Sequence, residues 1–128
     1  MSHLILLVED SPDVRLILTD LLCGSHYTVE AVEDGQTGLQ QASAKPFDLM
    51  ILDVMLPDIN GKAVCELIRS DPTMSDIKII CISGMVEEDK IEDLKAAGAN
   101  DFLHKPFEVE TLIERMCQLL DIEVVTNR

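Results

Sequence analysis

LILLVEDSPDVR, residues 4–15, is the stretch that decides the fold, because a strand pattern in it passes directly into a helix pattern. Its first five residues are all apolar, which predicts a strand buried on both faces of a sheet. Ser11 is a suitable N-cap and Pro12 suits the first helical position. We expect the helix to end near Gly24 and to face the core through its periodic apolar residues, which are Val14, Ile17, Leu18, Leu21 and Leu22.

The same alternation runs through the rest of the chain. Short apolar runs predict further buried strands at residues 28–32, 49–52, 77–82 and 101–103. Helical patterns follow them at residues 35–44, 62–69, 88–97 and 108–120. Five strand–helix units in 128 residues predict a single doubly wound α/β domain with a five-stranded parallel sheet. We expect that domain to cover residues 1–122 and to leave residues 123–128 as a C-terminal tail or the stub of a linker.

The charge of the chain excludes several kinds of partner. Ten Lys and Arg residues against 24 Asp and Glu residues give a net charge of −14. A field of that sign repels phosphate backbones and anionic membrane surfaces, so we expect this chain to bind neither nucleic acid nor membrane. The first apolar run is too short for a signal peptide or a membrane span, which favours a cytoplasmic location.

The cysteines give no sign of a metal site or a disulfide framework. Cys23, Cys65, Cys81 and Cys117 are far apart, with no CxxC pair and no Cys/His cluster. We expect reduced cysteines that are buried in the core.

Polar side chains with complementary chemistry follow the predicted strands. Ligands of such folds bind at the carboxyl ends of the strands. The residues found there are Glu9, Asp10, Asp53, Ser83 and Lys105. Three neighbouring carboxylates repel one another, and a hard divalent cation such as Mg²⁺, or Mn²⁺, relieves that repulsion.

These residue types also fit phosphoryl transfer. Asp53 ends the central strand and can act both as a metal ligand and as a carboxylate nucleophile that forms an acyl phosphate. The Lys105 ammonium suits a phosphate oxygen, and the Ser83 hydroxyl can donate to the same group. A phosphatase of the haloacid dehalogenase type is disfavoured, because the position of its acid/base aspartate holds Met55.

Four segments carry a resemblance to a known family: LILLVEDSPDVR, DLMILDVMLPDING, IICISG and AGANDFLHKPF. In order and spacing they resemble the receiver domain of response regulators in two-component and phosphorelay signalling, typified by the chemotaxis regulator. The resemblance implies a flavodoxin-like (βα)5 fold with strand order 2-1-3-4-5. It also implies a phosphoacceptor signalling domain, not an enzyme with a separate substrate, that receives a phosphoryl group on Asp53 from a histidine kinase or phosphotransfer protein.

The resemblance further implies the roles of individual residues. Mg²⁺ would be held by Glu9 or Asp10, by Asp53 and by the backbone carbonyl of Met55. Glu9 stands where Asp is common, so Asp10 is the expected direct ligand. Ser83 and Phe102 would form the switch pair, the Lys105–Pro106 bond would be cis, and the surface of residues 88–120 would contact a downstream protein.

Some interpretations stay open at this point. The chain could be a docking module of the same fold that is never phosphorylated, or a receiver from a longer DNA-binding regulator or hybrid kinase. Leu16 points away from the predicted core, and we expect it to be exposed and to contact the helices of a phosphodonor. Met55 and Met85 would cover the phosphate and slow its hydrolysis.

Overall fold

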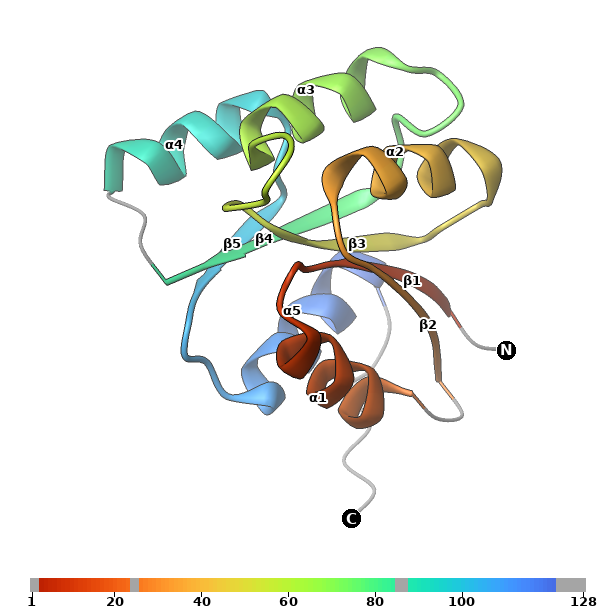
Figure 1. Cartoon of the computed structure of the whole chain (residues 1–128), viewed down its shortest axis with the longest axis vertical. Coiled ribbons are helices and arrows are strands. Elements are labelled where there is room, and N and C mark those ends of the chain that lie inside the picture. The colour runs from red at the N-terminus through yellow and green to blue at the C-terminus, as the bar shows by residue number, and fades with distance from the viewer. Residues whose placement is uncertain (1–2, 24–25, 85–87, 122–128) are drawn as a thin grey trace.

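Strands and helices alternate along the whole of the computed structural model, which describes residues 3–23, 26–84 and 88–121 (Figure 1). The strands are β1 (His3–Val8), β2 (Tyr27–Val32), β3 (Leu49–Asp53), β4 (Lys78–Ser83) and β5 (Asp101–His104). The helices are α1 (Pro12–Leu22), α2 (Gly35–Ala44), α3 (Gly61–Ser70), α4 (Glu88–Ala97) and α5 (Val109–Leu120). Within the described part of the chain, no helix has both the length and the apolar character needed to cross a membrane.

The five strands form one parallel sheet in the order β2-β1-β3-β4-β5. This is the flavodoxin-like order that the resemblance implied, so the predicted fold is confirmed. The sheet places β1 and β3 in its centre, where Val8 pairs with Leu52. The carboxyl ends of these two strands therefore lie side by side, with the end of β4 next to β3.

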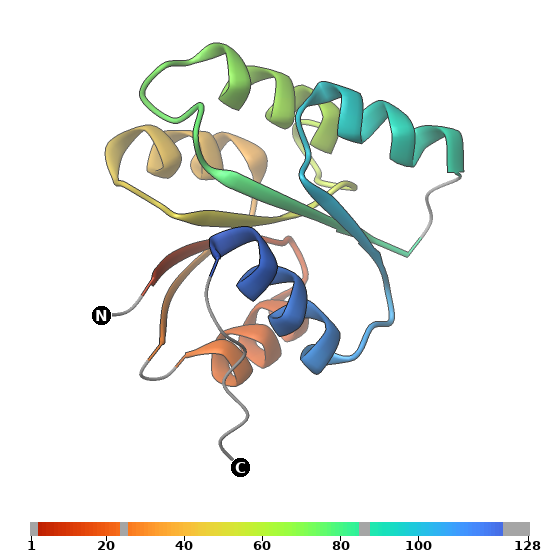
Figure 2. The same ribbon diagram turned by 180° about the vertical axis from the view of Figure 1, so that it is seen from behind.

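Helices cover both faces of the sheet. Figures 1 and 2 show α2, α3 and α4 on one face and α1 and α5 on the other. Successive strand residues alternate between two apolar cores, as the two-residue period of a strand requires. Leu6, Met50 and Ile79 belong to the core under α2, α3 and α4. Ile5, Ile51 and Ile80 belong to the core under α1 and α5.

The predicted core face of α1 is wrong at two positions. Leu18 and Leu22 are buried, but Ile17 is 55% exposed and Leu21 is 53% exposed. The helix contacts β2 and α5, and residues four apart along one line fill that contact. Ile17 and Leu21 fall outside the line. Leu16 is 64% exposed, as predicted.

The predicted burial of β2 and of Cys23 needs correction, and the predictions for Gly24 and for the C-terminal tail are not tested. β2 is an edge strand, so it is only partly buried, and Thr28 and Ala31 are exposed. Cys23 caps the C-terminus of α1 and is exposed, whereas the other cysteines are buried, and all four are free thiols. The predicted helix stop at Gly24 and the predicted tail lie outside the described residues.

The loop between β3 and α3 is tied to α2 by one carboxylate. Asp58 Oδ1 and Oδ2 accept hydrogen bonds from the backbone N–H groups of Gly35 and Gln36, each at 2.9 Å. These N–H groups lie at the start of α2, where a helix has unpaired donors and a positive dipole end. Desolvation acts to raise the pKa of Asp58, but the backbone donors outweigh it and hold that pKa below its ordinary value.

We predict a pH-dependent loss of stability for Asp58→Asn, because an amide offers one acceptor oxygen where the carboxylate offers two. A carboxyl with a lowered pKa stabilises the fold above its unfolded-state pKa of about 4, and this contribution is lost as the pH falls through the folded-state value. Thermal unfolding followed by circular dichroism should show a lower midpoint for the variant at pH 7 and a smaller difference at pH 3. Asp76→Asn, at an exposed loop position, is the control. An unchanged difference between pH 7 and pH 3 would contradict the role of the charge.

Candidate functional site

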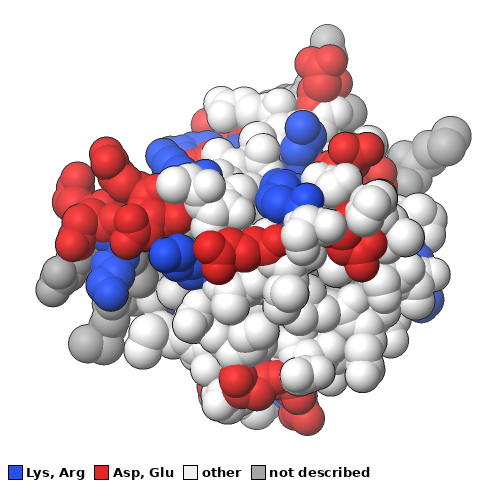
Figure 3. Space-filling view, turned by 90° about the horizontal axis from the view of Figure 1, so that it is seen from above, with Lys and Arg blue, Asp and Glu red and all other residues white. Residues whose placement is uncertain are grey.

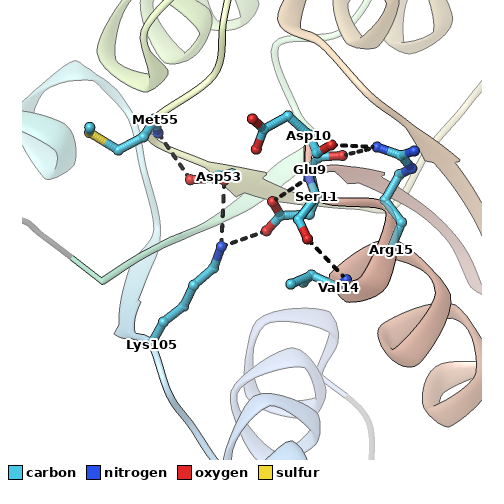
Figure 4. Close-up of polar contacts among 8 residues, drawn as sticks. All are labelled: Glu9, Asp10, Ser11, Val14, Arg15, Asp53, Met55 and Lys105. Carbon is cyan, nitrogen blue, oxygen red and sulfur yellow. Dashed lines mark hydrogen bonds and ion pairs between the residues drawn. The ribbon is translucent and has the colours of Figure 1, made fainter.

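The polar residues predicted at the strand ends meet at one edge of the sheet. Glu9 follows β1, Asp53 ends β3, Ser83 ends β4 and Lys105 follows β5. The backbone continues the sheet pairing beyond the strands, since Val54 N donates to Ile82 O and Lys105 N donates to Ser83 O, each at 3.0 Å. Parallel strands therefore deliver these side chains to a common site, most of which is drawn in Figure 4.

Three carboxylates form the centre of the site. Each of Glu9, Asp10 and Asp53 offers a carboxylate oxygen, and these oxygens all lie within 4.8 Å of one another. Glu9 and Asp53 are buried, at 0% and 4% exposure, whereas Asp10 is exposed. Like charges this close repel one another, most strongly where water is excluded. The site is thus arranged to hold positive charge.

Lys105 supplies part of that charge from the opposite side. Its Nζ donates to Glu9 Oε1 at 2.6 Å and lies 3.5 Å from Asp53 Oδ2. Desolvation acts to lower the pKa of Lys105, but the hydrogen bond to Glu9 and the charges of Asp53 and Glu9 outweigh it and raise that pKa. The ammonium therefore stays protonated and pairs more closely with Glu9 than with Asp53. The bond before Pro106 is cis, as the resemblance implied.

The Asp53 carboxylate is oriented by its own loop. Met55 N donates to Asp53 Oδ1 at 3.0 Å, which leaves Oδ2 on the Lys105 side. The Met55 side chain is 60% exposed and points away from the carboxylates (Figure 4). Its position gives no support to the expectation that it covers a phosphate on Asp53. Met85 lies outside the described residues.

Ser83 and Phe102 lie on the same side of the sheet. Cys81 and Phe102 are register partners, and both belong to the core under α2, α3 and α4. Ser83 is two residues beyond Cys81, so its side chain leaves β4 on that same face. Ser83 is 2% exposed and Phe102 is 8% exposed, with the Phe102 ring edge-to-face against His104. Ser83 and Phe102 therefore lie on neighbouring strands and on the same face of the sheet, two register positions apart.

Arg15 contributes to the site although it was not among the predicted residues. Its Nη1 donates to the backbone carbonyls of Glu9 at 2.8 Å and Asp10 at 3.0 Å. Sequence patterns carry little information on such a contact, because the acceptors are main-chain atoms that every residue has. The one feature of the sequence that points to this contact is the position of Arg15, which is one helical turn after the N-cap Ser11 and so faces back towards the end of the strand.

The donor set fits a hard divalent cation. The clustered donors are all carboxylate oxygens, and ions such as Mg²⁺ and Mn²⁺ prefer oxygen ligands. Three carboxylates face the single ammonium of Lys105, which leaves negative charge for a cation to balance. No sulfur or imidazole ligand joins this cluster among the described residues, so the softer metals are disfavoured.

Comparison with known proteins identifies the family. Residues 5–117 match the family described as response regulator receiver domain. The response regulator ArlR of Staphylococcus epidermidis is 41% identical over 117 residues, which are 91% of this chain and 52% of that protein. The chain thus spans about half the length of the curated relatives that it matches.

Solved structures agree with this match. A putative response regulator from Chloroflexus aurantiacus is 32% identical, with a TM-score of 0.88 over 94% of this chain and 99% of that one. The receiver domain of the sensor histidine kinase PA1611 from Pseudomonas aeruginosa is 27% identical, with a TM-score of 0.81 over 94% and 99%, and was solved with a magnesium ion coordinated in its active site cleft. With its acidic cluster at the expected edge of the sheet, the chain belongs to the response regulator receiver domains, the phosphoacceptor modules of two-component signalling.

Proposed function

We propose that this receiver accepts a phosphoryl group on Asp53 in a Mg²⁺-dependent reaction. The observation that carries the proposal is the placement of Asp53 at the tip of the central strand, between two other carboxylates and the Lys105 ammonium. An oxygen of the Asp53 carboxylate would form a bond to phosphorus, while the bond from phosphorus to a histidine nitrogen of the donor breaks. The imidazole keeps the electron pair of that bond and takes up a proton from water.

The surrounding residues have separate roles in this proposal. Lys105 leaves Glu9 and pairs with an oxygen of the phosphoryl group, for which a compact ammonium is suited. Ser83 donates its hydroxyl to a second oxygen. The Met55 N–H keeps Asp53 Oδ1 in place, so that the nucleophile is oriented before the donor arrives.

The cation would be held by Glu9, Asp10 and Asp53, with the Met55 carbonyl as a further ligand. It would supply charge that offsets the repulsion between the carboxylates and the incoming phosphoryl group. The magnesium reported for the PA1611 receiver supports this assignment by relatedness. Mn²⁺ has a similar ligand preference and is the expected substitute.

The output is a change in protein binding. Phosphate on Asp53 would attract the Ser83 hydroxyl. A shift of Phe102 would then alter the α4–β5–α5 surface, and this would change the fraction of molecules that can bind a partner.

The α4–β5–α5 surface has two notable charged features. Asp101 and Arg115 join β5 to α5 through a 2.7 Å ion pair. On α4, acidic side chains gather at one end of the molecule (Figure 3), and the exposed ones are Glu88, Asp89, Glu92 and Asp93. A target with basic residues fits this surface.

The phosphodonor would dock on the other side of the sheet, beside the acidic cluster. Leu16, Ile17 and Leu21 form an exposed apolar group on α1, here called the α1 patch. The helix that carries it begins directly after the acidic loop of Glu9 and Asp10. The histidine-bearing helices of a kinase or phosphotransfer protein must bring their phosphate to Asp53, and the α1 patch offers them an apolar contact there.

The wider assignments are also proposals. Relatives of about twice the length favour a receiver that works as one domain, residues 1–122, of a longer regulator, and residues 123–128 would then belong to a linker. The net charge of −14 favours protein partners over nucleic acid or membrane. A histidine kinase exposes its phosphohistidine to the cytoplasm, which is where this receiver would act.

One prediction from the proposed function concerns the phosphoacceptor residue. Asp53→Asn should reduce Mg²⁺-dependent labelling by a small acyl phosphate donor to background, because an amide oxygen is a poor nucleophile and cannot form the acyl phosphate. Labelling is measured by intact-protein mass spectrometry with Mg²⁺ or with EDTA. Asp76→Asn, at an exposed loop position, should label like the parent. Full labelling of the Asp53→Asn variant would place the phosphate elsewhere, and no labelling of the parent would favour a docking module that is never phosphorylated.

Another prediction from the proposed function concerns the phosphodonor protein. Leu16→Glu should slow phosphoryl transfer from a histidine-containing protein donor by about tenfold, which corresponds to ~1.4 kcal/mol of lost docking energy. Transfer from the small acyl phosphate should keep its rate, since Leu16 lies outside the pocket. Leu67→Glu replaces a 45% exposed leucine of α3, on the other face of the sheet, and should leave both rates unchanged. Equal slowing with both donors would indicate damage to the pocket and would contradict docking on the α1 patch.

A further inference from the structure

Arg15 makes an unusual set of contacts for a cation in the first turns of a helix. A positive charge near a helix N-terminus is disfavoured by the helix dipole. Arg15 is the fourth residue of α1, and its half-buried side chain turns back towards the end of β1 (Figure 4). There a single nitrogen, Nη1, donates to the carbonyl oxygens of Glu9 and Asp10. The contact with these two oxygens therefore explains an otherwise unfavourable position.

The helix itself does not need this contact in order to begin. Ser11 Oγ accepts a hydrogen bond from Val14 N at 3.4 Å, and Arg15 N donates to Ser11 O at 3.0 Å. The N-cap and the first main-chain bond of α1 are thus made without the guanidinium. What the side chain of Arg15 adds is a restraint on the two peptide groups that carry Glu9 and Asp10.

That restraint reaches the carboxylates through one peptide plane. The peptide between Asp10 and Ser11 accepts from Arg15 at its carbonyl, and its N–H donates to Glu9 Oε2 at 3.1 Å. Because a peptide group is planar, the guanidinium that fixes the carbonyl also fixes the direction of the N–H. A carbonyl that accepts a hydrogen bond also makes its own N–H a stronger donor.

The series of contacts continues to Asp53. The second oxygen of Glu9 accepts from Lys105, whose ammonium lies 3.5 Å from Asp53 Oδ2. One side chain on α1 is therefore connected, through a peptide and a carboxylate, to the opposite side of the site. Asp10 is held by the same side chain, since its own carbonyl is the second acceptor.

We propose that Arg15 is a positioning residue for the divalent cation, because it holds the main chain of Glu9 and Asp10 so that their carboxylates converge with that of Asp53. This inference rests on the proposed Mg²⁺ site. Arg15 touches neither the cation nor the phosphoryl group. Its effect on affinity comes from alignment of the ligands, as with other groups that orient metal-binding side chains through hydrogen bonds.

Alignment and simple charge predict opposite effects for removal of Arg15. If Arg15 acted only as a nearby positive charge, its loss would make the pocket more negative and tighten the binding of a cation. If it aligns Glu9 and Asp10, its loss lets the loop between β1 and α1 move and weakens binding. The sign of the change in affinity therefore separates the two roles.

The experiment measures Mn²⁺ binding by electron paramagnetic resonance and Mg²⁺ binding by calorimetry, on the full chain without a phosphodonor. Arg15→Met should raise the dissociation constant of both ions by about tenfold. Arg15→Lys keeps the charge but loses the guanidinium that contacts both carbonyl oxygens, so it should bind both ions more weakly than the parent and more tightly than Arg15→Met. Lys78→Met, at the amino end of β4 and exposed, removes one positive charge far from the site and should bind both ions like the parent.

Each outcome decides a different point. Failure of the parent protein to bind either ion would overturn the proposed Mg²⁺ site itself. Binding by the parent together with equal or tighter binding by Arg15→Met would overturn the positioning role and leave the Mg²⁺ site standing. Thermal unfolding in EDTA verifies that the variants fold. If Arg15→Met does not fold, Arg15→Lys is the test of the positioning role. The positioning role predicts that Arg15→Lys binds the cation more weakly than the parent although its charge is unchanged. Parent-like affinity of Arg15→Lys would contradict that role.

Discussion

The contact between the Lys105 ammonium and the Glu9 carboxylate is the interaction on which the site depends. Glu9 is 0% exposed, and an unpaired carboxylate at such a position would cost several kcal/mol, roughly 3–5 when one partner of a buried pair is removed. The 2.6 Å hydrogen bond from Lys105 offsets that cost. It allows a second carboxylate, that of Glu9, to be buried next to Asp53, and so keeps the pocket formed before a cation binds.

The same contact explains how the site can respond to its ligands. The ammonium lies between two carboxylates and is closer to Glu9 than to Asp53. A divalent cation at the carboxylates would compete with Lys105 for Glu9, and a phosphoryl group on Asp53 would offer it a new partner. Movement of the Lys105 ammonium over a short distance would thus link metal binding to phosphorylation. The loops that carry these residues are braced separately, by Arg15 on one side and by Asp58 on the other.

Much of this arrangement could be predicted from the sequence, for physical reasons. Central strands such as β1 and β3 are buried on both faces, so their apolar runs stand out, and their parallel alignment puts Glu9 and Asp53 at the same edge. The exposed positions Ile17 and Leu21 were misjudged because helical periodicity alone does not give the width of the contact that a helix makes. The edge position of β2 was equally hidden, since it depends on the order of the strands.

Within the site, the residue types predicted a cation and a phosphoryl group but could not rank the partners of Lys105. The choice of Glu9 over Asp53 depends on side-chain reach and burial, which only the folded chain reveals. The contribution of Arg15 could not be predicted from residue types, because its hydrogen bonds are to main-chain oxygens. In contrast, Asp10, Asp53, Ser83 and Lys105 all lie where the strand-end rule expects them.

The measurement that tests the central claim most directly is chemical mapping of the phosphorylated residue. The protein is treated with a small acyl phosphate and Mg²⁺, the acyl phosphate is reduced with borohydride, and the peptides are sequenced by mass spectrometry. Reduction converts a phosphorylated aspartate into homoserine. We expect homoserine at position 53, dependent on Mg²⁺ and absent in EDTA. Homoserine at position 10 in place of position 53, or modification that does not depend on Mg²⁺, would contradict phosphorylation of Asp53 at a magnesium site.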